Sequence, residues 1–422
     1  MPERPQRTRP QSVAADRITV EDQLETILRG VGPLQAYDQP LVESLGLSLH
    51  EDIEAERDIP HFDTAAIDGY AVRALDVADA GNGTSVELPV VGEIVAGSAK
   101  PFAISAGTAV RIMTGAPMPR GADAIVPLDK TDRGHARVRI AANVLAGSHV
   151  IPVADDVAAG SIVLPEGTVL GPREIGLVSA IGRSRVKARP RPRIVIISAG
   201  QELRDAGSHL DHDSVYDANS YMLAAAVRSI GAIAYRVGVV DDSPKAFKRV
   251  LSDQLVRADL VITTGGITEG GRDAVRSTLA EVGDIGFGRV AINPGGDVGF
   301  GTVFEEKTPL IALPAEPVSA YVGFEVFALP AIRRLMGRIP YRRPNVHAVL
   351  AADVASPSGV RDYVRAVFEV THRGAKVTPL TARGPHAVGS LAAANALIIV
   401  GEDETALNLG DTVRTIVLDR TF

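Results

Sequence analysis

Apolar residues recur with a helical period near the start of the chain and in short β-like runs after it. Within residues 19–28 the apolar positions fall on one face of a helix: Val20, Leu24, Ile27 and Leu28. Thr19 directly precedes this face and is expected to cap the helix, with Asp22 three residues later in place of the usual Glu or Gln. Over residues 47–129 and 149–170, Gly and Pro interrupt the apolar runs. These regions are therefore predicted to be β-rich.

The hydrophobic pattern changes at Pro190, where a Pro-stiffened segment leads into the continuously apolar run Ile194 to Ile197. A strand without alternation is typically buried on both faces, as in a parallel sheet. Helices are expected over 219–230, 244–256 and 318–335 and after residue 273, and strands over 232–240, 259–266, 285–292 and 310–314. This alternation predicts a doubly wound α/β sheet. After Arg342 four apolar strands predict a small barrel or sandwich.

Composition limits the classes of protein to which this chain can belong. At 422 residues it is expected to hold about three domains. The absence of Cys excludes disulfides, thiolate metal sites and Cys nucleophiles. A net charge of −7 argues against nucleic-acid binding, and no apolar run approaches the roughly 20 residues that insertion into a membrane requires. The Arg- and Pro-rich residues 1–15 lack the apolar core of a signal peptide and are predicted to be a disordered arm of a cytoplasmic protein.

A glycine-rich loop, TTGGITEGGRD (263–273), follows an apolar strand and opens a predicted helix. Gly265, Gly266 and Gly270 allow backbone N–H groups to approach a ligand, and a helix N-terminus favours anions. A tight strand-to-helix turn would use the same glycines. The loop by itself leaves ligand binding and a plain turn equally open.

The β-rich part offers two acids and a hydroxyl as candidates for chemistry. Asp63 and Asp68 lie in HFDTAAIDGYAV, where paired carboxylates can hold a cation or act as acid and base. Asp68 and Gly69 together are also an ordinary hairpin-turn signal, which is the favoured interpretation of the local pattern. Thr114 stands at a Gly-bounded turn as a candidate hydroxyl contact, although a plain connector between strands explains it as well.

Further acids follow the predicted strands of the α/β sheet. Glu202 comes after the strand that ends near Ser198, Asp242 follows Val240, and Asp273 follows the glycine-rich loop. Each acid alone is best explained as a helix N-cap. Because ligand crevices form at the carboxyl ends of parallel strands, three acids at that edge favour a site.

Five strings together resemble the MoeA/gephyrin E-domain family. In chain order they are FDTAAIDGYAV (62–72), RIMTGAPMPRGADAIVP (111–127), ISAGQEL (197–203), YDANSYML (216–223) and LPAEPVSAY (313–321). The resemblance implies a mixed α/β and β fold, in which L-shaped subunits form a homodimer. The implied parts are an elongated dimerisation subdomain (16–60 with 142–189), an inserted β subdomain (61–141), a molybdopterin-binding-type α/β domain (190–338) and a C-terminal β-barrel (339–422).

The same resemblance implies a set of site residues. The enzymatic members of the family use molybdate and adenylated molybdopterin and release AMP. The positions implied as catalytic are Asp63, Thr114, Asp156, Glu202, Asp242 and Asp273, with Mg²⁺ held by Glu202 and Asp242. The positions implied to bind the pterin cofactor are Gly265, Gly266, Gly270, Pro314 and Pro317.

The chain departs from the family's pattern where the family carries cations. The family's Lys-Pro-Gly-Lys-Pro is here residues 293–297, Asn-Pro-Gly-Gly-Asp, and its arginines before Gly-Glu-Asp are replaced by the apolar residues 151–153. Glu316 adds an acid in place of a neutral amide. Charge-assisted hydrogen bonds contribute about 1.5–3 kcal/mol each, so the loss predicts weak binding of anions.

Two functions remain open. The lost cations favour a gephyrin-like scaffold that needs no cofactor and binds a disordered peptide of a membrane receptor or of the tubulin-like division protein FtsZ. Such a partner would recruit a cytoplasmic protein to the membrane or the division site. Leu24 falls where gephyrin binds partner peptides, although core packing explains it too. The alternative, which the remaining acids favour, is an active molybdopterin molybdotransferase.

Overall fold

A computed structural model describes residues 17–97, 102–241, 243–267, 274–372, 374–382 and 384–419. The chain divides into two compact units. The smaller unit comprises Asp38–Leu45 and Leu49–Ala188, and the larger one comprises Met1–Tyr37, Gly46–Ser48 and Arg189–Phe422. Within the described ranges, every helix is too short or too polar to cross a membrane.

The smaller unit contains a five-stranded sheet in the order β8-β5-β7-β6-β9. Its strands are β5 (Gly69–Val72), β6 (Val86–Ile94), β7 (Ala109–Ile112), β8 (Ala124–Pro127) and β9 (Arg137–Ile140). Both faces of the sheet are covered: Tyr70 and Val126 belong to one hydrophobic core, whereas Ala71 and Ile125 belong to another. The predicted β structure is confirmed. The expected hairpin turn at Asp68 and Gly69 is wrong, because Gly69 begins β5, which pairs with β7 and β8.

Short elements make up the rest of the smaller unit and its borders. They are β1 (Tyr37–Pro40), η1 (Leu41–Glu43), β2 (Ser48–Leu49), β3 (Ile53–Glu54), β4 (Thr64–Ala65), η2 (Ala74–Val77), η3 (Leu128–Lys130), β10 (Val150–Ile151), β11 (Ile162–Leu164), α2 (Pro172–Ala180) and β12 (Arg185–Arg189). The sequence pattern did not predict α2, which spans nine residues and buries only Val178. Its start is fixed by Pro172 at the first position and by the Glu174 carboxylate, which accepts the Gly171 N–H at 3.0 Å.

The larger unit is built on a six-stranded sheet in the order β16-β13-β17-β21-β20-β18. The strands are β13 (Arg193–Ala199), β16 (Ile233–Val240), β17 (Leu260–Thr264), β18 (Gly283–Arg289), β20 (Asp297–Val303) and β21 (Thr308–Leu313). The first four strands of this order run parallel, as predicted. β20 runs antiparallel to these four, because a short turn after Val303 folds it back onto β21. β18 pairs antiparallel with β20 and therefore runs in the same direction as the first four strands.

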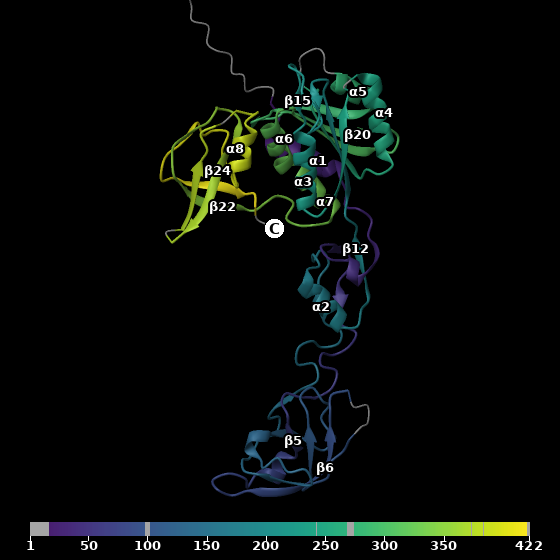
Figure 1. Cartoon of the computed structure of the whole chain (residues 1–422), viewed down its shortest axis with the longest axis vertical. Helices are drawn as coiled ribbons and strands as arrows, with labels where there is room; N and C mark the ends of the chain where they lie inside the picture. Colours follow the sequence, from purple (N-terminus) through teal and green to yellow (C-terminus); the bar gives the residue numbers. More distant parts are fainter. Residues whose placement is uncertain are drawn as a thin grey trace, which may run out of the picture. The chain divides into compact units, whose positions relative to one another are not determined.

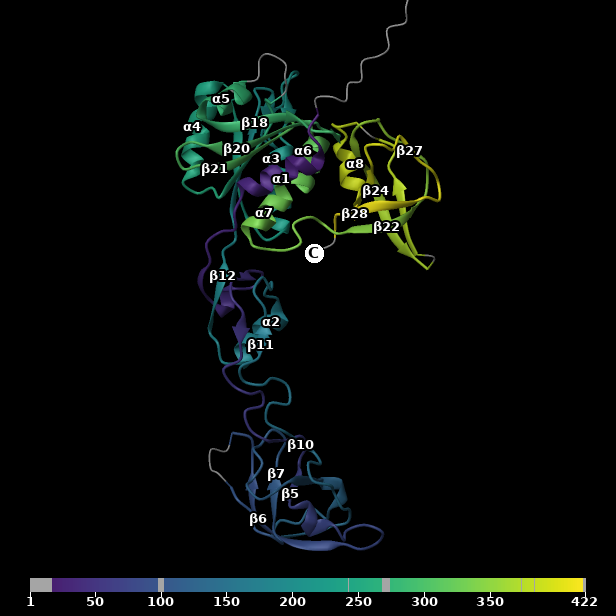
Figure 2. The same cartoon turned by 180° about the vertical axis from the view of Figure 1, so that it is seen from behind.

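Helices cover both faces of this sheet. The helices are α1 (Val20–Gly30), α3 (Asn219–Ser229), α4 (Pro244–Leu255), α5 (Ala274–Val282), α6 (Pro317–Gly323) and α7 (Leu329–Leu335). Figures 1 and 2 show α4 and α5 on one side of the sheet and α1, α3, α6 and α7 on the other. Ile194 and Ile196 of β13 belong to the hydrophobic core that contains α1, α3, α6 and α7, whereas Val195 and Ile197 belong to the core that contains α4 and α5. Successive residues of a strand point to opposite faces, so the continuously apolar strand is explained by the two helical layers.

Two helix predictions have different outcomes. The cap of α1 is confirmed, since the Thr19 hydroxyl accepts the Asp22 N–H at 3.0 Å. The single helix expected over 318–335 is interrupted by a π-helical turn, η4 (Phe324–Ala328). Pro330 lies two residues after this turn and has no N–H to donate, so a regular α-helix would be strained there.

The C-terminal part of the larger unit is a closed barrel. Its strands are β19 (Ile292–Asn293), β22 (Asn345–Leu350), β24 (Arg361–Thr371), β25 (Gly374–Pro379), β26 (Ala396–Val400) and β28 (Thr412–Val417), with the small elements β23 (Val354–Ala355), β27 (Ala406–Leu407) and α8 (Val388–Ala393) beside them. The order β19-β24-β25-β22-β28-β26 closes because β26 also pairs with β24. The predicted barrel is confirmed.

Candidate functional site

A cavity of about 130 Å³ lies at the carboxyl ends of the parallel strands, and we call it the strand-end cavity. Two short strands, β14 (Leu203–Arg204) and β15 (Val215–Tyr216), form one wall. The cavity is lined by Ser198, Ala199, Glu202, Leu203, Val215, Tyr216, Asp217, Ala218, Asn219, Thr264, Gly265, Ala315 and Pro317. These residues come from separate segments that only the parallel sheet brings together.

Gly265 shapes the floor of this cavity. Its φ of +95° belongs to the left-handed region, and a Cβ atom there would lie 2.5 Å from the carbonyl oxygen of Ala199. Glycine therefore allows the end of β17 to approach the end of β13. Gly266 also has a positive φ, and a Cβ there would lie 2.6 Å from Val275 of α5. In the described part of the glycine-rich loop, Gly265 thus borders the cavity and Gly266 packs closely against α5.

A buried hydrogen-bond network holds the opposite wall. Thr264 Oγ1 donates to the carbonyl oxygen of Pro314 at 2.7 Å. Asn219 Nδ2, on the first residue of α3, donates to Thr264 Oγ1 at 2.9 Å and to the carbonyl oxygen of Ala315 at 2.6 Å. These bonds tie α3 to the ends of β17 and β21, so the wall is fixed by neutral polar groups.

The charged side chains of the strand-end cavity are acidic. Glu202 is exposed, and its carboxylate has no hydrogen bond or ion pair with another described residue. The Asp217 carboxylate is buried, and it accepts hydrogen bonds from the N–H and hydroxyl groups of Ser220. Among the described lining residues there is no Lys or Arg. The cavity itself therefore supplies no fixed cation to an anionic ligand.

The structure brings only some of the predicted site residues together. Glu202, Gly265 and Pro317 line the strand-end cavity, and Pro314 accepts a hydrogen bond in its wall. Asp242, Asp273 and Gly270 lie outside the described residues. Gly266 adjoins the cavity through its neighbour Gly265.

Three predicted residues belong to the smaller unit instead. Asp63 Oδ1 accepts the Val153 N–H at 2.9 Å, and Thr114 donates its hydroxyl to Asp68 Oδ1 at 2.7 Å. The backbone N–H and the hydroxyl of Thr114 hold the pKa of Asp68 below its usual value. Asp156 lies in an exposed turn, where its backbone N–H donates to the Ile59 carbonyl. Both hydrogen bonds join segments that lie far apart in the sequence, so Asp63 and Thr114 connect separate loops of the smaller unit.

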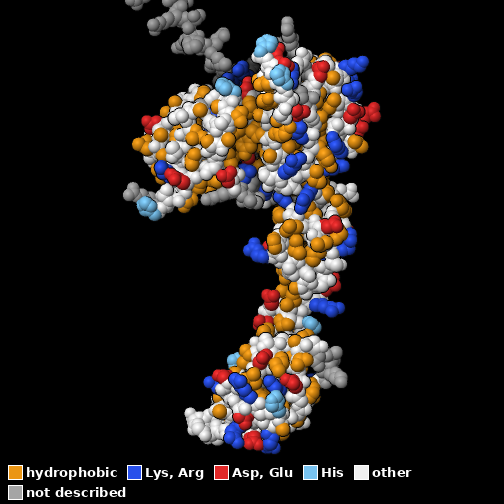
Figure 3. Space-filling model, in the orientation of Figure 1, with side chains coloured by type: hydrophobic (Ala, Val, Ile, Leu, Met, Phe, Trp, Pro, Cys, Tyr) orange, Lys and Arg blue, Asp and Glu red, His pale blue; other side chains and the backbone are white. Residues whose placement is uncertain are grey.

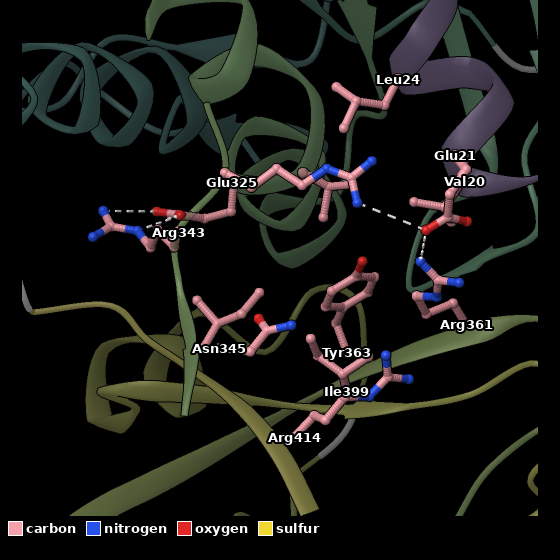
Figure 4. Close-up of a pocket in the computed structure, with 13 residues that line it drawn as sticks. Val20, Glu21, Leu24, Glu325, Arg343, Asn345, Arg361, Tyr363, Ile399 and Arg414 are labelled. Carbon is pink, nitrogen blue, oxygen red and sulfur yellow. Dashed lines mark hydrogen bonds and ion pairs between the residues drawn. The ribbon is translucent and has the colours of Figure 1, made fainter. Parts of the chain in front are cut away.

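A second cavity, of about 120 Å³, lies within the larger unit between α1 and the barrel, and we call it the α1–barrel cavity. Figure 4 shows Val20, Glu21 and Leu24 entering from α1 and Tyr363 rising from β24. The full lining is Val20, Glu21, Leu24, Glu325, Val326, Arg342, Arg343, Asn345, Arg361, Tyr363, Ile399, Arg414 and Ile416. Leu24 is 1% exposed, so it serves the hydrophobic core and forms part of the cavity wall.

Ion pairs organise most of the arginines in this cavity. Arg343 Nε lies 2.7 Å from Glu325 Oε2, and both side chains are almost fully buried. Arg361 contacts Glu21 (Figure 4), and it also lies 2.7 Å from Glu402. Burial raises the pKa of Glu21, but the hydrogen bond and charge of Arg361 outweigh it and hold the pKa below its usual value.

The remaining polar groups leave this cavity positive. Burial raises the pKa of Tyr363 to about 12, so the phenol stays neutral. Four arginines and two glutamates line the cavity, and the Arg414 guanidinium forms no ion pair with a described residue. Sequence reasoning missed this cluster. Its charged residues come from distant segments, and the acidic net charge of the chain gives no sign of it.

Comparison with known proteins decides the family. Three family models match in order: the MoeA N-terminal region (domain I and II) over residues 18–182, a probable molybdopterin binding domain over 195–334, and the MoeA C-terminal region (domain IV) over 347–418. The chain belongs to the MoeA family. The resemblance stated from the sequence strings is thereby confirmed.

Individual MoeA relatives cover nearly the whole chain. Molybdopterin molybdenumtransferase 2 of Mycobacterium tuberculosis is 40% identical over 88% of this chain and 92% of its own length. Molybdopterin molybdenumtransferase 1 of the same organism is 36% identical over 94% and 97%. The crystal structure of a molybdopterin biosynthesis MoeA protein from Pyrococcus horikosii has a TM-score of 0.83 at 28% identity, covering 96% of this chain and all of that one.

Proposed function

We propose that the chain is a molybdopterin molybdenumtransferase, which inserts molybdate into adenylated molybdopterin and releases AMP. The strand-end cavity carries this proposal, because it gathers Glu202, Gly265 and Pro317 at one edge of the parallel sheet. Relatives that match 88% and 94% of the chain bear the transferase name. This likeness over nearly the whole length favours the enzyme over the scaffold that the lost cations favoured.

Mg²⁺ is the cofactor that suits the charge of this cavity. Molybdate and phosphate are anions, whereas the described charged lining residues are Glu202 and Asp217. A carboxylate oxygen such as that of Glu202 is a ligand that Mg²⁺ prefers, and the bound cation would supply the positive charge that phosphate oxygens need. Asp242, the second ligand that the family resemblance implies, is proposed on that resemblance alone.

AMP release tests the proposed function. The purified chain with adenylated molybdopterin, molybdate and Mg²⁺ is expected to release AMP in a molybdate-dependent manner. Glu202→Gln should lower the rate by about 10- to 100-fold, the range of one charge-assisted contact. The exposed Glu305 lies outside the cavity, so Glu305→Gln is the matched control. An inactive wild type would refute the proposed function. Equal rates in the two variants would refute the role of Glu202.

A peptide-binding scaffold is the second candidate, and the α1–barrel cavity favours it. Leu24, Val20 and Ile399 offer apolar contacts, while Arg414 adds a positive charge that no described ion pair engages. A disordered segment with an acidic and an apolar residue would match this lining. The division protein FtsZ and membrane receptors remain the proposed sources of such a segment, and recruitment of the chain to the membrane or division site follows from them.

Binding of purified FtsZ and a deletion phenotype test this second candidate. Fluorescence anisotropy with a labelled FtsZ tail should show saturable binding that Arg414→Ala weakens. Deletion of the gene should change cell shape or division in addition to molybdoenzyme activity. If deletion affects molybdoenzymes alone and the tail does not bind, the scaffold is excluded.

We further propose that the chain acts as a homodimer. The smaller unit exposes several large apolar side chains, among them Val42 (84% exposed), Leu145 (81%) and Ile162 (59%). The family resemblance implies a homodimer, and these side chains are candidates for the surface that a second subunit would cover. Light scattering at micromolar concentration should give the mass of two chains, and a monomer alone would contradict the proposal.

A further inference from the structure

The buried network of the strand-end cavity fixes the orientation of the Asn219 amide. The carbonyl oxygen of Ala315 can only accept a hydrogen bond, so the Asn219 atom 2.6 Å away must be the donor Nδ2. Thr264 Oγ1 donates its own hydrogen to the Pro314 carbonyl. It can therefore only accept a hydrogen bond from Asn219. Rotating the amide would place an acceptor against two acceptors. The other atom of the amide is therefore Oδ1.

Asn219 Oδ1 is left without a partner. Asn219 is 7% exposed, and its Oδ1 atom forms no hydrogen bond with any residue that the structure describes. Buried polar atoms are nearly always paired, so an unpaired acceptor in the wall of a cavity indicates a group that arrives from outside the chain. The nearby Glu202 carboxylate is also an acceptor without a described partner.

We propose that Asn219 Oδ1 recognises an N–H donor on the edge of a planar heterocycle bound in the strand-end cavity. This inference rests on the proposed function, whose substrate carries two such heterocycles. The pterin offers a ring N–H and an amino group, and the adenine offers an amino group. Both present the same chemistry, an N–H donor in the ring plane. Asn219 would act as a specificity residue, because a ligand without the donor leaves the oxygen buried and unpaired.

Methylated ligand pairs provide the test. Binding of neopterin and of AMP to the full chain is measured by calorimetry, each beside an analogue whose N–H hydrogens are replaced by methyl groups. The wild type is expected to bind at least one parent compound about tenfold more tightly than its methylated form, the contribution of one neutral hydrogen bond. Asn219→Ala should remove that preference. A general loss of structure would weaken the parent and the methylated form alike.

Two further variants separate recognition from folding. Asn395 is a half-buried amide of the barrel whose Oδ1 and Nδ2 are both paired with Phe368, so Asn395→Ala should lower stability and leave the N–H preference intact. Thr264→Ser keeps the hydroxyl that receives a hydrogen from Nδ2, and it too should retain the preference. The wild-type comparison stands even if Asn219→Ala does not fold.

The outcomes distinguish the two heterocycles and the two proposals. A preference confined to neopterin assigns the pterin to Asn219, and one confined to AMP assigns the adenine. The inference is overturned if the wild type binds neither parent, if it does not distinguish the methylated forms, or if Asn219→Ala keeps the preference. If the chain releases no AMP but still prefers the ligand that carries the N–H group, the transferase function is refuted and the role of Asn219 is retained.

Discussion

The strand-end cavity and the α1–barrel cavity are close in volume, about 130 and 120 Å³, but they differ in how far their polar groups are already paired within the chain. The first is walled by backbone, glycine and neutral hydrogen bonds, and it keeps Glu202 and the Asn219 oxygen unengaged. In the second, most charged side chains are already paired with one another. Charge alone is therefore a poor guide to a binding site, because a paired charge serves stability and an unpaired acceptor serves a ligand.

Charges on the outer surface add a third pattern. On the face that carries α4 and α5, positive and negative side chains lie interspersed (Figure 3). Lys248 and Glu281, for example, form an exposed ion pair at 2.6 Å. Exposed pairs contribute about 0–1 kcal/mol, so these charges affect solubility more than stability or binding. Substitutions can test whether paired, unpaired and exposed charges differ in their contribution to stability and binding.

The largest effect is expected from the buried ion pair of the α1–barrel cavity. Arg343→Met leaves the Glu325 carboxylate without its cation in a site where its side chain is 2% exposed. Breaking such a pair should lower the free energy of unfolding by about 3–5 kcal/mol. The matched control is Arg342→Met, since the Arg342 side chain is 55% exposed and lies 3.8 Å from Glu21. Urea denaturation of both variants measures the difference.

The stability loss of Arg343→Met should also depend on pH. Burial raises the pKa of Glu325 above its ordinary value of 4.5, and removal of Arg343 removes the main opposing influence. An acid with a raised folded pKa is fully accommodated below its unfolded pKa and destabilises the fold as the pH rises through the folded pKa. The deficit should therefore shrink as the pH falls toward 4.5. A deficit that grows on acidification would contradict this account.

A smaller effect is expected at the floor of the strand-end cavity. Gly265→Ala combines a φ of +95° with a Cβ atom 2.5 Å from the Ala199 carbonyl, so we expect a loss of about 1–3 kcal/mol. Gly207 has a similar φ of +87°, and a Cβ atom there would have no neighbour within 4 Å. Gly207→Ala therefore isolates the backbone strain from the contact. Equal losses in thermal unfolding would show that the close approach to Ala199 contributes nothing.

The cap of α1 should contribute less again. Thr19→Ala removes the acceptor for the Asp22 N–H and should lower the free energy of unfolding by about 1 kcal/mol. Thr26 in the middle of the same helix donates its hydroxyl to the Asp22 carbonyl and caps nothing. Thr26→Ala is therefore expected to be close to neutral, and a larger loss there than at Thr19 would refute the capping role.

Local patterns predicted local structure well. The capped helix α1 and the strands β13, β16 and β17 follow from periodicity and capping residues that lie within one segment. The reversed direction of β20 did not follow, because strand direction depends on a pairing between segments. The π-helical turn before Pro330 was also missed, since the apolar pattern continues through it without a break.

The candidate site was predictable only in part, because it too depends on contacts between separate segments. Glu202, Gly265 and Pro317 stand in strings that follow predicted strand ends, so their convergence could be expected. Asn219 stands in one of those strings too, but its unpaired oxygen appears only once Thr264 and Ala315 are placed around it. The charged cluster of the α1–barrel cavity joins Glu21, near the start of the chain, to arginines that lie between residues 342 and 414. A local sequence pattern cannot predict a contact across such a separation.

The smallest effect on stability is expected at Arg414, which tests whether an unengaged charge behaves differently from a paired one. Arg414 lines the same cavity as Arg343, but it is exposed and forms no ion pair with a described residue. Arg414→Ala should therefore change the free energy of unfolding by less than about 0.5 kcal/mol. If the cavity accepts an acidic segment, the same variant should weaken that binding and make it less sensitive to salt, because one screened attraction has been removed. A stability loss approaching that of Arg343→Met would mean that Arg414 supports the fold, and the division between paired and unengaged arginines in this cavity would be wrong.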